Sequence, residues 1–241
     1  MEGRPRSPQD FDIWFRQSGD PWGYHEQPIR ERLQMTVRFL RRCLDDGFSG
    51  HFLEIGAYNG DFTMLLGQQF PRAVVTVNDI SEIALDRARN AVSSWPEMSV
   101  RTHFLLKDCL SITKDDFASN LCERPTVILL LECLYYLGTE EQERALANLA
   151  NIFPEAPLVI SGPVTGQPYF SQEELLELLD LSGQHLITMK VLNLRQWNRL
   201  PGLRIIVDRC RFLRQILANQ MIFFSVPRRG APLNCIKARC L

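Results

Sequence analysis

The chain has 241 residues, of which 45% are hydrophobic, so it can form one large α/β domain with a substantial core. Its formal net charge of -1 gives no general argument for a nucleic acid or an anionic membrane as partner. It has neither an apolar run of the roughly 20 residues that cross a bilayer nor an N-terminal secretory signal, so we expect a cytoplasmic protein. Its seven cysteines and four scattered histidines predict reduced core thiols and no metal site.

Two helices are predicted in the first 46 residues. Residues 10–16 mix aromatic and charged side chains at helical spacing, and residues 28–45 keep an apolar stripe with Pro28 in the first turn. The intervening Asp20-Pro21-Trp22-Gly23-Tyr24 is rich in turn-forming residues and breaks the helical pattern. We therefore expect an N-terminal helical segment, residues 1–46, ahead of the main domain.

A strand, a glycine turn and a helix follow at residues 51–66. The strand ends at Glu54, and the turn has the spacing Glu-x-Gly-x-x-x-Gly with Gly56 and Gly60. Neither glycine has a Cβ, so bare backbone can approach a ligand there, and the next helix directs its first N–H groups at the same crevice.

The spacing of this turn distinguishes between nucleotide ligands. Dinucleotide folds use Gly-x-Gly-x-x-Gly, with an acidic residue about 20 positions further on. Here Tyr58 replaces the second close-approach glycine, and the carboxylate of Glu54 precedes the turn. A carboxylate there repels a pyrophosphate and attracts a sulfonium, which favours S-adenosylmethionine. An NAD-linked oxidoreductase is correspondingly disfavoured.

Strands and helices then alternate, which is typical of a parallel sheet covered on both faces. Ser81 and Ser171 are expected to cap helices. The remaining strands are predicted at 73–77, 100–106, 126–131, 157–161, 185–194 and 221–226, and the helices at 81–92, 140–151, 171–181 and 201–218. Residues 47–226 would form the main domain, and 227–241 a loose polar tail.

Polar residues recur where these strands end, and ligands of open parallel sheets bind beyond the carboxyl ends of strands. Asp79 could accept both ribose hydroxyls, although a helix-cap role is the alternative. Asp108 could accept from the adenine amine, or be a simple turn residue. Ile80 and Leu131 could enclose the purine, or belong to the core.

The layout resembles the class I S-adenosylmethionine-dependent methyltransferases over roughly residues 50–165, in the segments 53–60, 77–81, 107–110 and 131–137. The resemblance implies an α/β, doubly wound, mostly parallel seven-stranded sheet with helices on both faces and an antiparallel last strand. It also implies S-adenosyl-L-methionine as cofactor. The cofactor-binding residues expected on this basis are Trp22, Tyr24, Glu54, Gly56, Ala57, Gly60, Asp79, Ile80, Asp108, Cys109 and Leu131.

A narrower resemblance, carried by residues 20–24 and 132–137, is to the nodulation-type N-methyltransferases and related bacterial natural-product methyltransferases. It implies that the N-terminal helix covers the cofactor as a lid, with Trp22 and Tyr24 as lid aromatics; core packing is the alternative for both. The aromatic-Glu pair of that family is present only as Ile29-Arg30-Glu31, so its acceptor is not carried over.

The expected function is methyl transfer to a small-molecule acceptor, with N-methylation ahead of O-methylation. A neutral amine needs positioning more than a strong base, and His25, Glu132 and Tyr135 are the candidate catalytic residues. A non-catalytic module that binds the nucleoside is the alternative of another class. We expect no nucleic acid or membrane partner, and a homodimer is compatible with the sequence.

Overall fold

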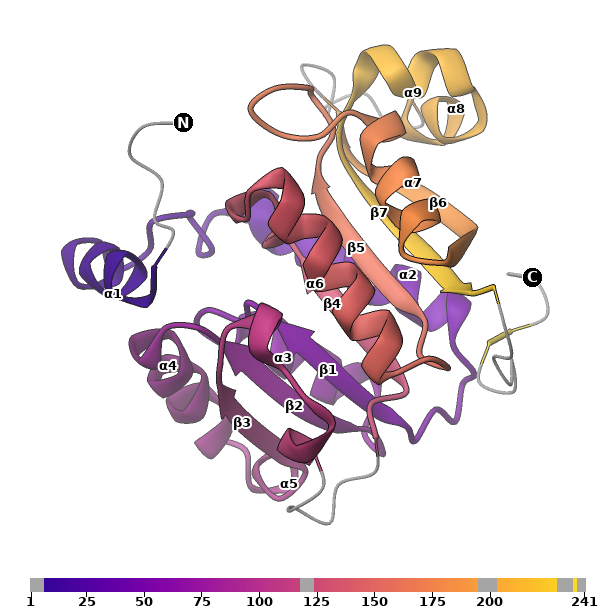
Figure 1. Ribbon diagram of the computed structural model, residues 1–241. Coiled ribbons are helices and arrows are strands. Elements are labelled where there is room, and N and C mark those ends of the chain that lie inside the picture. The colour runs from indigo at the N-terminus through magenta and orange to yellow at the C-terminus, as the bar shows by residue number, and fades with distance from the viewer. Residues whose placement is uncertain (1–6, 118–123, 195–202, 229–235, 238–241) are drawn as a thin grey trace.

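A seven-stranded sheet forms the centre of the computed structural model, which describes residues 7–117, 124–194, 203–228 and 236–237 (Figure 1). The strand order is β3-β2-β1-β4-β5-β7-β6. The first five strands pair in parallel, whereas β7 runs antiparallel to both β5 and β6. This arrangement confirms the predicted sheet and its reversed last strand. The strands are β1 (His51–Ile55), β2 (Val74–Asp79), β3 (Thr102–Leu106), β4 (Val127–Leu131), β5 (Leu158–Pro163), β6 (Gln184–Leu194) and β7 (Ala218–Pro227).

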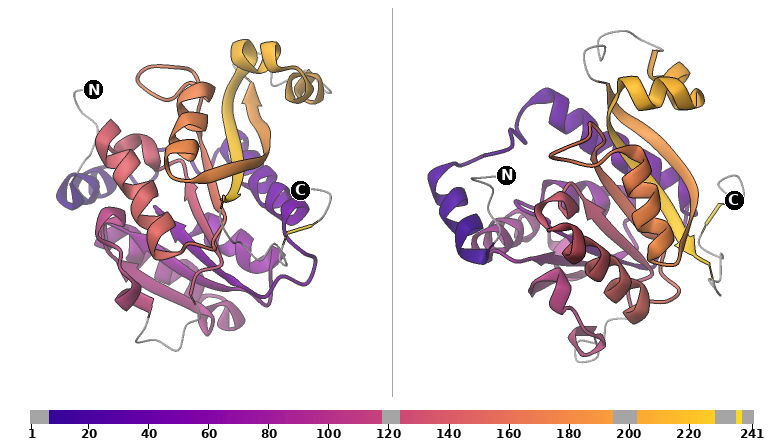
Figure 2. Two further views of the ribbon diagram at one scale, coloured as in Figure 1. Left: turned by 45° about the vertical axis from the view of Figure 1, so that its right-hand side comes forward. Right: turned by 45° about the horizontal axis from the view of Figure 1, so that its top comes forward.

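Helices cover both faces of the sheet because successive side chains of a buried strand point to opposite faces. On β1, Phe52 belongs to the core cluster that includes side chains of α2 (Gln27–Cys43), α3 (Asp61–Gln69) and α4 (Glu82–Ser93). Its neighbour Leu53 belongs to the cluster on the other face, which includes side chains of α6 (Thr139–Ile152) and α7 (Gln172–Leu181). Figures 1 and 2 show α6 and α7 together on one side of the sheet, with α2 on the other.

Three details differ from the sequence prediction. A short helix, α5 (Pro96–Ser99), precedes β3. The helix expected at 201–218 is divided into α8 (Leu203–Arg209) and α9 (Arg211–Leu217), because the backbone of Cys210 is extended. Most of the expected loose tail lies outside the described residues, but Ile236 is buried and pairs with Leu44.

The N-terminal helix α1 (Pro8–Gln17) is tied to α4 and does not belong to the sheet layers (Figure 1). The Arg87 guanidinium donates to the carbonyl oxygens of Phe15 and Gly19, at 2.8 and 3.1 Å. The Ser81 hydroxyl donates to Asp12 and also caps α4, as predicted. These contacts hold the segment 8–24 over the carboxyl ends of the strands. None of the described helices is both long and apolar enough to cross a membrane.

Candidate active site

A cavity of about 390 Å³ lies at the carboxyl ends of β1, β2 and β4, beneath the N-terminal segment. Its position matches the rule for open parallel sheets, where ligands bind beyond the carboxyl ends of the strands. Ten of the residues expected from sequence line it: Trp22, Tyr24, Gly56, Asp79, Ile80, Asp108, Cys109, Leu131, Glu132 and Tyr135. His25, Glu54, Ala57 and Gly60 are outside its lining.

The turn after β1 requires both of its glycines. Gly56 has φ 75°, and a Cβ there would lie 2.8 Å from the Cβ of Cys133, which is closer than real carbon atoms approach. Gly60 has φ 80° and caps α3, with the backbone of Ala88 2.9 Å from where a Cβ would be. Gly56 therefore exposes backbone to the cavity, whereas Gly60 lets α3 pack closely on α4.

Asp79 ends β2 and is presented to the cavity by the backbone on either side. Its Oδ2 accepts from the Tyr58 N–H at 3.0 Å, and its Oδ1 accepts from the Ser81 N–H at 2.9 Å. Burial raises the pKa of Asp79 to about 6, although these amide hydrogen bonds act in the opposite direction. A carboxylate oriented in this way has lone pairs left to accept from two adjacent hydroxyl groups, such as those of a ribose.

The next part of the cavity is formed by the residues that follow β3. Asp108 caps a short 3-10 helix by accepting from the Leu110 N–H at 2.9 Å, which is the turn role; it also lines the cavity, and acceptance from an adenine amine stays a prediction. Burial raises the pKa of the Cys109 thiol to about 12, so this thiol is protonated at neutral pH. Together with Ile80 and Leu131, Cys109 gives this part of the cavity an apolar wall of the kind that suits a purine.

Glu54 does not line the cavity, although its place ahead of the glycine turn predicts a carboxylate that attracts the sulfonium of the ligand. It shares the sheet face of Phe52, and its Oε2 accepts from the Thr63 hydroxyl of α3 at 2.6 Å. Burial is the main cause that raises its pKa to about 8. Glu54 is largely protonated at pH 7 and lies outside the lining, so the acidic residues that line the cavity are Asp79, Asp108, Glu132 and Glu141.

The buried proton of Glu54 gives a prediction for stability. Between the ordinary pKa of 4.5 and the folded pKa of about 8, the native state holds a proton that the unfolded chain releases. Stability should therefore decrease as pH rises through this window, and Glu54→Gln should be more stable than the parent at pH 8 by about 1–3 kcal/mol. Urea unfolding at several pH values measures both effects. Glu97→Gln, an exposed control, should retain the pH slope of the parent; an equal slope in Glu54→Gln would contradict the assignment.

Glu132 follows β4 at the mouth of the cavity, and residues of α2, β5 and β7 hold its side chain. Its backbone is left-handed, with φ 59°, which turns the carboxylate toward β5 and β7. Oε1 accepts from the Ser161 hydroxyl at 2.9 Å, and Oε2 accepts from Gln220 Nε2 at 3.1 Å. Arg32 Nη1 lies 4.0 Å from Oε2, and the Glu132 side chain is 11% exposed. The result is a fixed, nearly buried carboxylate that faces the cavity.

Arg32 is the most informative residue that the sequence argument missed. It projects from α2 into the cavity with its side chain 12% exposed, and its Nε has no hydrogen-bond partner among the described residues. A buried donor without a partner is costly, so the site has capacity for an anionic group. The distance of 4.0 Å between Arg32 Nη1 and Glu132 Oε2 is too long for a hydrogen bond, so Glu132 does not satisfy the guanidinium. The missed lining residues also include Tyr58, Asn78, Tyr169 and Gln220.

Aromatic side chains close the cavity from the N-terminal side. Trp22 packs edge-on against Tyr58 with ring centroids 4.6 Å apart, and its Nε1 donates to the Tyr136 hydroxyl at 2.8 Å. Tyr24 lies 5.0 Å from the Tyr58 ring, and burial raises the pKa of Tyr24. Trp22 and Tyr24 thus occupy the place expected of lid aromatics, and they also pack with one another.

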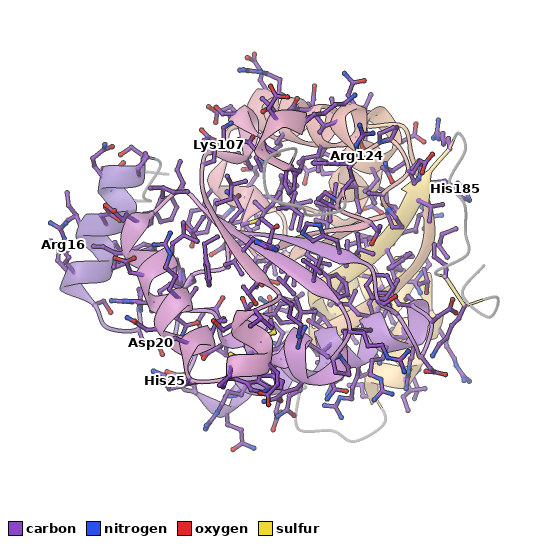
Figure 3. All side chains as sticks on the ribbon, turned by 90° about the horizontal axis from the view of Figure 1, so that it is seen from below. Arg16, Asp20, His25, Lys107, Arg124 and His185 are labelled. Carbon is purple, nitrogen blue, oxygen red and sulfur yellow. The ribbon has the colours of Figure 1, made fainter. Side chains whose placement is uncertain are left out.

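His25 lies on the surface, outside the lining of the cavity, although it follows Tyr24 directly. Its backbone N–H donates to Asp20 Oδ2 at 3.0 Å, and Figure 3 labels both residues. Within a turn, neighbouring side chains point in different directions, so Tyr24 is partly buried while His25 is exposed. The geometry gives no support to a catalytic role for His25.

The cavity fits S-adenosylmethionine in each of its parts. Asp79 can accept from a ribose, the wall around Ile80 and Cys109 can enclose a purine, and the open donor of Arg32 can bind the carboxylate of the methionine tail. Gly56 allows that tail to approach the backbone. The sheet order and this site together define the class I S-adenosylmethionine-dependent methyltransferases.

Comparison with known families identifies one family within this class of methyltransferases. The model of the family described as nodulation protein S (NodS) matches residues 16–164, which is more than half of the chain. The chain belongs to this family, which confirms the narrower resemblance. The crystal structure of the N-methyltransferase NodS from Bradyrhizobium japonicum WM9 has a TM-score of 0.56 and 19% identity, over 87% of this chain and 99% of that one.

Other similar proteins carry different names. Magnesium protoporphyrin IX methyltransferase from Synechocystis PCC 6803, solved with bound SAM, has a TM-score of 0.60 at 16% identity, covering 94% of this chain and all of that one. Malonyl-[acyl-carrier protein] O-methyltransferase from Neorickettsia risticii is 28% identical over 79% of this chain and 74% of that protein. Ribosomal RNA large subunit methyltransferase G from Klebsiella pneumoniae is 28% identical over 49% of this chain. The chain spans 32% of that relative's length.

Proposed function

We propose that this protein transfers a methyl group from S-adenosylmethionine to a nitrogen atom of a small-molecule amine. The observation that carries the proposal is the carboxylate of Glu132, which Ser161 and Gln220 hold at the mouth of the cavity. A fixed carboxylate in a site of low dielectric attracts an ammonium group strongly. The similar protein from Bradyrhizobium japonicum is an N-methyltransferase, which supports the same choice of atom.

S-adenosylmethionine, when bound, supplies a methyl group carried on a positively charged sulfur. The residues around the cavity bind and orient it: Asp79 through the ribose hydroxyls, and Arg32 through the carboxylate of the amino-acid tail. The aromatic cover formed by Trp22, Tyr24 and Tyr58 keeps water away from the reacting atoms. Such positioning can contribute roughly 7–11 kcal/mol to catalysis without any strong base.

Glu132 is the candidate that orients the amine and accepts its proton. An amine that arrives as an ammonium ion must lose a proton before its lone pair can attack, and Glu132 is placed to hold that proton. Burial raises the pKa of Tyr135 well above its usual range, so its phenol keeps its proton and can take part in hydrogen bonds but cannot act as a base. We therefore assign Tyr135 a positioning role beside Glu132.

A panel of acceptors tests the proposal. The protein is incubated with S-adenosylmethionine and matched compounds that carry an amine, a hydroxyl or a carboxyl group on the same skeleton, and products are identified by mass spectrometry. We expect methylation on nitrogen in preference to oxygen. Preferred methylation of the hydroxyl or carboxyl compounds would favour an O-methyltransferase, as the Neorickettsia relative is named. Binding of the cofactor with no turnover of any compound would favour a non-catalytic module.

A further inference from the structure

A second cavity of about 300 Å³ adjoins the first, and the same three tyrosines line both. It is formed by α6, α7 and the segment between β5 and α7, which lie on one side of the sheet (Figure 2). Four residues line both cavities: Tyr135, Tyr136, Leu137 and Tyr169. A molecule whose reacting group lies near Glu132 in the first cavity can therefore extend into the second.

The charged residues that line the second cavity, among those that the structure describes, are all acidic. Glu143 of α6 and Glu174 and Glu177 of α7 line it, whereas no lysine, arginine or histidine is among its described lining residues. Glu174 accepts from the Ser171 N–H and so caps α7. Neither Glu143 nor Glu177 takes part in a salt bridge within the described part of the chain. Two carboxylates are thus available to a cation in this cavity.

The wall that connects the two cavities is aromatic. Tyr135 and Tyr169 pack edge to face, with ring centroids 5.3 Å apart, and Phe170 lines the second cavity beyond them. Aromatic faces attract cations and pack well against methylene chains. The surface between Glu132 and the distal carboxylates therefore suits a flexible apolar linker with a positive group at each end.

We propose that the second cavity binds the distal end of the acceptor, and that the acceptor is an elongated amine with a second cationic group. The proposal rests on the proposed N-methyltransferase function and specifies the substrate class of that site. The reacting nitrogen lies beside Glu132, the linker crosses Tyr135 and Tyr169, and the second cation lies between Glu143 and Glu177.

The test compares two kinds of amine in two proteins. A graded series of α,ω-diamines from butane to dodecane, and the n-alkylamines of the same lengths, are assayed with the parent and with Glu143→Gln/Glu177→Gln. Because each partly screened ion pair changes affinity by less than about tenfold, we expect kcat/KM to favour long diamines by about threefold to thirtyfold. The double variant should lose this preference and methylate monoamines at the parent rate.

Glu173→Gln is the matched control, since Glu173 lies on α7 outside the cavity lining and bonds to Gln215. It should keep the diamine preference. Equal kcat/KM of monoamines and long diamines in the parent would overturn the proposal, as would an equal loss on both classes in the double variant. If no amine is methylated, the proposed function fails. Calorimetry of a long diamine against protein saturated with S-adenosylhomocysteine then decides separately, and binding that the double variant leaves unchanged overturns the distal site.

Discussion

Replacement of Asp79 by alanine is expected to weaken the binding of S-adenosylmethionine by about 100-fold or more, because two hydrogen bonds from ribose hydroxyls to a buried carboxylate are lost. The backbone of Tyr58 and Ser81 holds both oxygens of that carboxylate, so its orientation costs nothing at the moment of binding. Isothermal titration calorimetry with the cofactor measures the loss.

Two controls separate this effect from damage to the fold. Asp79→Ala leaves the Tyr58 and Ser81 amides without their acceptor, so thermal unfolding of the variant is measured in parallel. Asp86→Ala, on the exposed side of α4, should bind the cofactor like the parent. In the parent, an S-adenosylhomocysteine analogue without the ribose hydroxyls should lose a similar factor. Unchanged affinity in Asp79→Ala would remove Asp79 from the site.

Replacement of Glu132 by glutamine is expected to lower kcat/KM for an amine by about 100-fold, which is typical of the loss of a positioned proton acceptor. Glutamine keeps the size of the side chain and can still bond to Ser161 and Gln220, but it carries no charge to attract or deprotonate an ammonium ion. Affinity for S-adenosylmethionine should change by less than about threefold, because the carboxylate faces the acceptor. Steady-state kinetics and calorimetry measure the two effects.

The pH dependence adds a second readout for Glu132. If the carboxylate accepts the proton of the amine, raising the pH should partly restore the activity of Glu132→Gln, because more of the amine is then neutral. Glu140→Gln makes the same chemical change outside the cavity and should leave both constants unchanged. A variant that loses cofactor affinity but keeps its acceptor kinetics would place Glu132 at the cofactor.

Local patterns were sufficient to predict most of the fold. The alternation of apolar strands and amphipathic helices defines the sheet, since each short apolar run must be covered on both faces. The undivided helix at 201–218 was a wrong prediction: its apolar pattern continues across Cys210, but the backbone there is extended. Periodicity shows which residues are apolar, but it does not show where the chain must bend to keep packing against neighbouring elements.

The candidate site was predictable to the extent that it is local. Asp79 is the last residue of β2, and Gly56, Asp108 and Glu132 come just after strand ends; parallel strands bring such residues to one edge of the sheet. Arg32 was not predictable in this way, because a charged residue on an amphipathic helix is ordinarily solvated. Its place in the cavity depends on how α2 packs against the sheet, close to Glu132.

Glu54 shows most clearly the difference between what local sequence predicts and what tertiary packing decides. Its position ahead of a glycine turn indicates a nucleoside site, and the family of the chain agrees with that prediction. Whether its charge acts in the site depends on the face to which it points, and it points to α3 and Thr63. Spacing along a chain reports which groups are neighbours in sequence, whereas burial and direction arise when segments far apart pack together. The succession of strands and helices and the class of cofactor therefore follow from the amino-acid order, while tertiary packing decides that Glu54 points to Thr63 and that Arg32 lies close to Glu132.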